Sequence, residues 1–286
     1  MITPDRLCDA VDVGYRHSTV LGERVLEAAA AEYTAALGGR VLAIYALGSL
    51  AHGGFCPAVS DVDLGLVLRQ RQPGDEALVD RVRHIVQSSG LALAERLSVF
   101  WSSHTALRRG QADGRFPAAD RLDLADHGRL LSGRAVPPLP RPSAAELAVD
   151  GARFALRLLA DERTLAEIRQ PGRLMEDPVR FTKIVLLPVR LRYTGDTGRF
   201  GLTDAAVRYH IGDRDAPARD LVCAAQAVRN GVRLEPHLLL TLAHRGLADL
   251  YRYFIDHQLR RLPELGADAG AMVPDFRRCL EALSPR

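Results

Sequence analysis

The spacing of apolar residues changes at a proline-rich segment near the middle of the chain. Before it, short apolar runs alternate with amphipathic segments, which predicts strands between helices. The predicted helices are 20–37 and 75–88, and the predicted strands are 41–47, 62–68 and 97–101. After it, the helical period of about 3.6 residues dominates. The helices predicted there are 144–168, 178–194, 203–211, 217–230 and 237–260.

The proline-rich segment reads Val136-Pro-Pro-Leu-Pro-Arg-Pro142. Proline cannot continue a helix or a central strand, so this stretch predicts a semi-rigid linker. Ser143 and Glu146 then have the spacing of a capping box at a helix start. We therefore predict an α+β fold. Its domain 1–136 has a small mixed sheet with flanking helices, 137–143 is the linker, and 144–286 is an all-helical domain.

Composition narrows the class of protein. The chain has 286 residues, 47% of them hydrophobic and 26% charged, with a net charge of only +3. No apolar run approaches the ~20 residues of a membrane span, no apolar signal core is present, and the four cysteines lack CxxC spacing. These features favour a cytoplasmic globular protein without a zinc site. No concentrated basic block is present, which argues against a nucleic-acid partner such as a tRNA- or RNA-tailing enzyme would need.

The candidate functional residues lie between the first two predicted strands and at the start of the second. Gly48-Ser49 follows the first strand, and eleven residues later Asp61-Val62-Asp63 opens the second. Gly48 lets the backbone turn close to a ligand, and Ser49 and the amides after it can meet phosphate oxygens. Asp61 and Asp63 project from the same face of a strand, where two carboxylates can hold Mg²⁺ together with substrate phosphates. An isolated pair of this kind could equally be solvated, but here it lies in an apolar strand.

This arrangement resembles the nucleotidyltransferases of the DNA polymerase β superfamily. The segment Lys183 to Gly198, followed by Thr203-Asp-Ala-Ala206, is also similar to the helical domain of the streptomycin and spectinomycin adenylyltransferases. The resemblance implies that AMP moves from ATP, with Mg²⁺, to a hydroxyl of a small antibiotic-like acceptor in a cleft between domains. It further implies that Lys183 faces the nucleotide phosphates. Lys183 is the only lysine among 38 basic residues, which makes a merely solvated role less expected there.

Several neighbouring positions have two interpretations. Arg190 and Tyr193 could line that cleft or serve only the packing of the helix. His52, in the loop after Ser49, could contact the nucleotide or be a solvated loop residue. The identity of the acceptor and the oligomeric state are not indicated by the sequence.

One position departs from the family pattern. Active members carry a third carboxylate on the neighbouring strand, and aligning Leu97-Ser-Val99 with their motif places Arg96 there. A one-residue bulge could return Glu95 to the site as metal ligand or base, or Asp123 or Asp126 could replace it. Alternatively, Arg96 neutralises charge, and the chain is a nucleotide-binding homologue with lost or repurposed chemistry.

Overall fold

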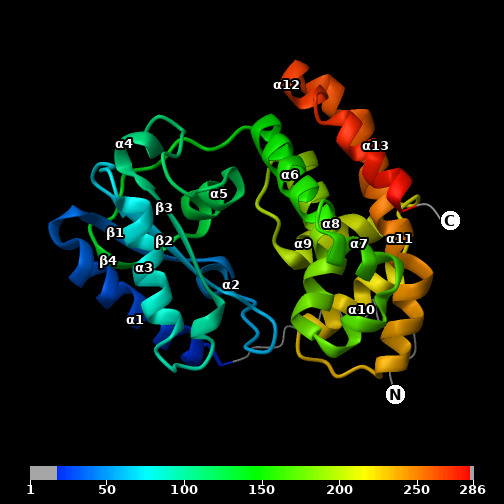
Figure 1. Cartoon of the computed structure of the whole chain (residues 1–286), viewed down its shortest axis with the longest axis horizontal. Coiled ribbons are helices and arrows are strands. Elements are labelled where there is room, and N and C mark those ends of the chain that lie inside the picture. The colour runs from blue at the N-terminus through cyan, green and yellow to red at the C-terminus, as the bar shows by residue number, and fades with distance from the viewer. Residues whose placement is uncertain (1–17, 284–286) are drawn as a thin grey trace. The chain divides into compact units, whose positions relative to one another are not determined.

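The computed structural model describes residues 18–283. They divide into two compact units, one ending at Pro142 and the other beginning at Ser143. The first is built on a sheet and the second on helices (Figure 1). The fold is therefore mixed, as predicted.

One sheet organises the first unit. Its strands are β1 (Val41–Leu47), β2 (Val62–Leu68), β3 (Leu97–Ser103) and β4 (Arg129–Gly133). The spatial order is β3-β2-β1-β4, with β2 and β3 parallel and the other pairs antiparallel. The parallel pair needs a crossover, and α3 (Asp75–Gln87) supplies it. The predicted mixed sheet is confirmed.

The two faces of this sheet are covered by different helices. Alternate residues of β2, Val62 to Leu68, pack with α1 (Val20–Leu37) and α3 in one apolar cluster. The other face packs with α4 (His104–Leu107) and α5 (Ala118–His127) through residues such as Leu47 and Leu124. Because side chains alternate along a strand, Asp61 and Asp63 belong to this second face, the one that α5 covers.

The predicted helix 20–37 and the three predicted strands are confirmed, and the first helix is matched to the residue. The apolar patterns did not predict α2 (Gly48–His52), α4, α5 or β4. The strand β4 is a short, largely exposed edge strand, so it has little of the burial that produces an apolar pattern.

The second unit consists of helices packed around α8. They are α6 (Ala144–Leu159), α7 (Glu162–Arg169), α8 (Pro178–Thr197), α9 (Thr203–Gly212), α10 (Arg219–Arg229), α11 (Pro236–Arg261), α12 (Ala267–Gly270) and α13 (Val273–Ala282). Within residues 18–283, none of the helices is both long and apolar enough to cross a bilayer.

Capping explains where the first of these helices begin and end. The Ser143 hydroxyl accepts a hydrogen bond from the Glu146 amide, at 3.1 Å, so the predicted cap is confirmed. The single helix predicted over 144–168 is two helices instead. The Asp161 carboxylate accepts from the Thr164 amide at 3.0 Å and starts α7. An aspartate is a strong N-cap, and it outweighs the continuous helical pattern.

A half-buried polar cluster ties α8, α9 and α11 together. The Arg192 guanidinium lies over the rings of Tyr209 and Tyr253, 5.5 and 4.7 Å from their centroids. It also donates to Asp213 at 2.6 Å, and the Tyr253 hydroxyl donates to the same carboxylate. These hydrogen bonds, from Tyr253 first and then Arg192, hold the pKa of Asp213 far below its usual value.

We expect Asp213→Asn to destabilise the protein by roughly 1–3 kcal/mol at pH 7, because hydrogen bonds to an ionised group are lost. A depressed pKa gives stability above the unfolded-state value of about 3.9 that disappears as the pH falls through the lower folded-state value. The difference between wild type and variant should therefore shrink below about pH 4. Urea unfolding at pH 7 and pH 3 measures it, with the exposed neighbour variant Asp215→Asn as control. Equal differences at both pH values would contradict the assignment.

Candidate functional site

The turn after β1 brings the Gly-Ser motif against the second aspartate of the other motif. Gly48 has φ +60°, in the left-handed region that favours glycine. A Cβ at this position would overlap the Asp63 Oδ2 atom. Leu47 and Asp63 are also direct partners in the β1–β2 register. Gly48 is therefore needed both for its backbone conformation and for the close approach of the Asp63 carboxylate.

The two aspartates lie at the start of β2, Asp61 directly before the strand and Asp63 within it. Asp61 and Asp63 are both partly exposed, while Val62 between them is fully buried on the opposite face. Two carboxylates on one strand face suit Mg²⁺, which binds to one or two carboxylates and completes its shell with phosphates and water. Within residues 18–283, no three His, Cys, Asp or Glu side chains are grouped to hold a metal by themselves. Two carboxylates are a donor set that Mg²⁺ accepts.

Ser49 lies in α2 and is only 7% exposed. The Gly48 amide has a partner within the protein, because it donates to Asp123 Oδ2 at 2.6 Å. That amide is thus already engaged, and the contribution of Gly48 is the shape of the turn.

A histidine contacts the carboxylate that binds the Gly48 amide, and a second histidine packs against the first. Asp123, on α5, is almost completely buried, and its Oδ1 lies 3.0 Å from the Nδ1 atom of His127 one helical turn later. The His127 ring meets the ring of His52 edge-on, with centroids 5.4 Å apart. The turn of the Gly-Ser motif, the end of α2 and the end of α5 therefore form one polar cluster.

The strand pairing decides which residue occupies the third-carboxylate position. Asp63 pairs with Ser98, and the parallel register of β2 and β3 runs from Val62 and Leu97 onward without a bulge. Arg96 and Asp61 each precede the first paired residue of their strands. Arg96 and Glu95 both belong to the 3₁₀ turn Ala94–Arg96, and Glu95 lies one residue further from β3. No bulge returns it to the strand.

The side chains at this position are engaged locally. Arg96 donates to the Pro57 carbonyl oxygen at 2.8 Å, which ties the end of β3 to the loop before Asp61. The Glu95 carboxylate is 65% exposed and lies 3.6 Å from the Arg96 Nε atom. Asp126, the other acid considered, forms an ion pair with Arg141 in the linker segment. Of the alternatives to Glu95, only Asp123 approaches the Gly-Ser turn.

The remaining predicted residues lie in the helical unit, on α8. Lys183 is exposed on this helix. Arg190 donates to the Gly201 carbonyl oxygen at 2.7 Å and so fixes the turn between α8 and α9. Tyr193 is 9% exposed and packs edge-on against Tyr209. For Arg190 and Tyr193 the contacts support the packing interpretation.

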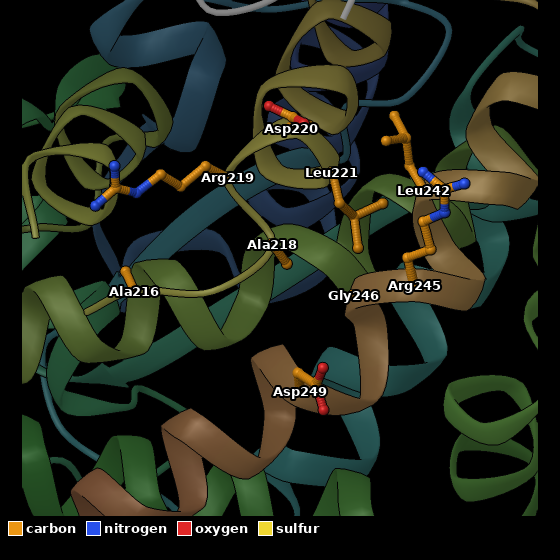
Figure 2. Close-up of a pocket in the computed structure, with 9 residues that line it drawn as sticks. All are labelled: Ala216, Ala218, Arg219, Asp220, Leu221, Leu242, Arg245, Gly246 and Asp249. Atoms are coloured by element: carbon orange, nitrogen blue, oxygen red, sulfur yellow. The ribbon is translucent and has the colours of Figure 1, made fainter. Parts of the chain in front are cut away.

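A cavity of about 430 Å³ lies between the start of α10 and the middle of α11. Its lining includes two arginines, Arg219 and Arg245, and two acids, Asp220 and Asp249. In Figure 2 the two guanidinium groups extend in different directions, so they do not converge on one ligand. The cavity contains none of the predicted site residues, and sequence patterns gave no signal for it.

Comparison with known proteins gives a structural similarity only. No protein-family model matches the chain, and no curated protein sequence is similar to it. Its structure is similar to that of spectinomycin adenyltransferase AAD(9) from Enterococcus faecialis, determined with ATP and spectinomycin. The TM-score is 0.53 and the identity 14%, and the match covers 78% of this chain and 98% of the other. This similarity shows that the two chains share a nucleotidyltransferase-like fold.

Proposed function

We propose that the protein is a Mg²⁺-dependent nucleotidyltransferase that moves AMP from ATP to a hydroxyl group of a small molecule. The observation that carries this proposal is the contact between Gly48 and Asp63, because it joins the two motifs into one site. A carboxylate that was merely solvated would not be expected to lie against the backbone of the neighbouring turn. The similarity to a solved adenyltransferase supports the same class.

Each residue has a defined part in this proposal. Asp61 and Asp63 hold Mg²⁺, which would withdraw charge from the phosphates that it contacts. Ser49, directly after the turn, orients the phosphate group. Phosphoryl-type transfer depends mainly on positioning and charge, so a rigid turn next to the carboxylates is the main contribution of the protein.

Lys183 remains part of the proposal as a positive charge toward the triphosphate. Lys183→Ala should therefore weaken binding of ATP and leave the fold intact, since its side chain is exposed. The acceptor is proposed to be antibiotic-like, because the protein of similar fold was crystallised with spectinomycin.

A second candidate follows from Arg96. The resemblance places a carboxylate at this position, whereas the Arg96 guanidinium is a fixed cation that donates to the Pro57 carbonyl oxygen in the loop before Asp61. A chain of this kind could bind a nucleotide without transferring it, as a sensor or a repurposed protein.

One experiment separates the two candidates. The full chain is incubated with isotopically labelled ATP, Mg²⁺ and a panel of hydroxylated antibiotics and sugars that includes spectinomycin, and the products are analysed by mass spectrometry. A transferase yields an acceptor that is heavier by one AMP. Tight binding of ATP with no such product across the panel would favour the second candidate.

A further inference from the structure

The proposed transfer requires a group that accepts the proton of the attacking hydroxyl, and the third-carboxylate position does not offer one. Arginine is protonated at all physiological pH values and cannot act as a base. Glu95 lies outside the strand, beside the Arg96 guanidinium. A base has to come from another element that reaches the Gly-Ser turn.

The helix α5 covers the sheet face that carries Asp61 and Asp63, and its last turn is the element that reaches this site. Asp123 and His127 are four residues apart and therefore lie on one side of the helix. A Cβ on Gly48 would overlap the Asp63 Oδ2 atom, and the Gly48 amide nitrogen lies 2.6 Å from the Asp123 Oδ2 atom. Together with the bonds inside Gly48, these short steps keep the two carboxylates within about 8 Å of each other. By the same steps, the His127 ring is within about 13 Å of Asp63.

We infer that His127 is the general base of the proposed transferase and that Asp123 is its positioning residue. This inference rests on the proposed function. Asp123 uses one oxygen to fix the Gly48 turn and the other to hold Nδ1 of His127. When Nδ1 donates to the carboxylate, Nε2 is the nitrogen that takes up a proton. A carboxylate behind a histidine sets its tautomer and stabilises the imidazolium that forms.

The step balances without a further reactant. The proton of the acceptor hydroxyl moves to Nε2 of His127 while the hydroxyl oxygen forms a bond to the α-phosphorus of ATP. The bond from that phosphorus to the bridging oxygen breaks, and pyrophosphate leaves with the electron pair.

Two titratable side chains contact the His127 ring, one from its own helix and one from α2. Asp123 lies on the same helix, and His52, at the end of α2, packs edge-on against the ring. His52 thereby limits the orientation of the ring. The arrangement is a buried acid, an oriented imidazole and an aromatic support, placed beside the turn of the Gly-Ser motif.

The test compares wild type with His127→Gln, Asp123→Asn and the matched control His84→Gln. His84 lies on α3, exposed, and also has Nδ1 in a hydrogen bond. Three quantities are measured with the full chain: calorimetric affinity for α,β-methylene-ATP with Mg²⁺, the single-turnover rate of AMP transfer to the panel acceptors or to water from pH 5 to 9, and the ¹⁵N shifts of the histidine rings.

We expect His127→Gln to lower transfer by roughly 10²–10⁴-fold and to lose the fall in rate on the acid side, with affinity for the analogue within twofold of wild type. Asp123→Asn should change the tautomer of His127 in the ¹⁵N spectrum and lower transfer less. His84→Gln should match wild type. A purely structural role of His127 would instead lower affinity and rate together and leave the pH profile unchanged.

Two results would overturn the inference in distinguishable ways. If wild type transfers AMP and His127→Gln does so within threefold, with the same pH profile, the base is another group and the proposed function stands. If wild type binds no analogue, or binds it and transfers AMP neither to the panel nor to water, the transferase proposal fails and the inference fails with it.

Discussion

Asp63→Asn is expected to reduce AMP transfer by roughly 10³-fold, which corresponds to about 4 kcal/mol of lost transition-state stabilisation. Asparagine keeps the shape of the side chain against Gly48 but removes the charge that would hold the metal ion. Asp61→Asn should have an effect of the same kind. The single-turnover rate of AMP transfer at saturating ATP and Mg²⁺ measures both.

The control for this prediction is Asp80→Asn. Asp80 is a 58% exposed residue of α3, paired with Arg83 on the surface of the same unit, so its loss should leave transfer unchanged. The thermal midpoint should shift little in Asp63→Asn, because the packing of the turn is preserved. A variant that folds and still transfers AMP within a few-fold of wild type would show that Asp63 does not belong to the active site.

Gly48→Ala is expected to lose stability and transfer together. An L residue in the left-handed region costs about 1–2 kcal/mol, and the added methyl group would in addition force the Asp63 carboxylate away from its place. Displacement of a catalytic group by about 1 Å can cost roughly 10²-fold in rate. We therefore expect a transfer rate lower by about that factor.

Gly74→Ala is the matched control, since Gly74 also has a positive φ but a Cβ there would meet nothing within 4 Å. Gly74→Ala should lower stability only by the cost of an L residue at positive φ, and it should leave AMP transfer unchanged. Urea unfolding and single-turnover transfer, measured on both variants, separate strain from the contact with Asp63. Equal effects of the two substitutions would mean that the Gly48–Asp63 contact has no functional role.

The parts of the site that lie within one strand or one turn could be predicted from the sequence. Alternation along residues 62–68 correctly predicted the strand that carries Asp63, and the Gly-Ser pair was correctly placed at the end of β1. These features depend on local geometry, which an apolar pattern records directly.

The parts of the site that depend on contacts between distant segments could not be predicted from the sequence. Asp123 contacts Gly48 across 75 positions of sequence, and no local pattern encodes that distance. The helix that carries Asp123 was itself missed, because its three aspartates in ten residues weaken the apolar stripe. An acid four residues before a histidine was the available signal, but without the helix it had no structural meaning.

The sequence alone also could not decide whether Glu95 or Arg96 occupies the third-carboxylate position. The sequence allowed a bulge that would exchange the two, and only the pairing of β2 with β3 determines the register. A shift of one residue reverses which side chains face the site. In the observed register, Arg96 donates to the Pro57 carbonyl oxygen. The proposed base therefore comes from α5.

We propose that the Gly48-Ser49 turn and the Asp61-Val62-Asp63 strand form a nucleotide site that depends on a divalent metal. Titration calorimetry of the full wild-type chain with α,β-methylene-ATP, once with Mg²⁺ and once with EDTA, tests this dependence. We predict saturable one-to-one binding that is at least about tenfold tighter with Mg²⁺, because the carboxylates and the phosphates would otherwise repel each other. Equal affinity in both titrations, or no binding in either, would contradict the claim.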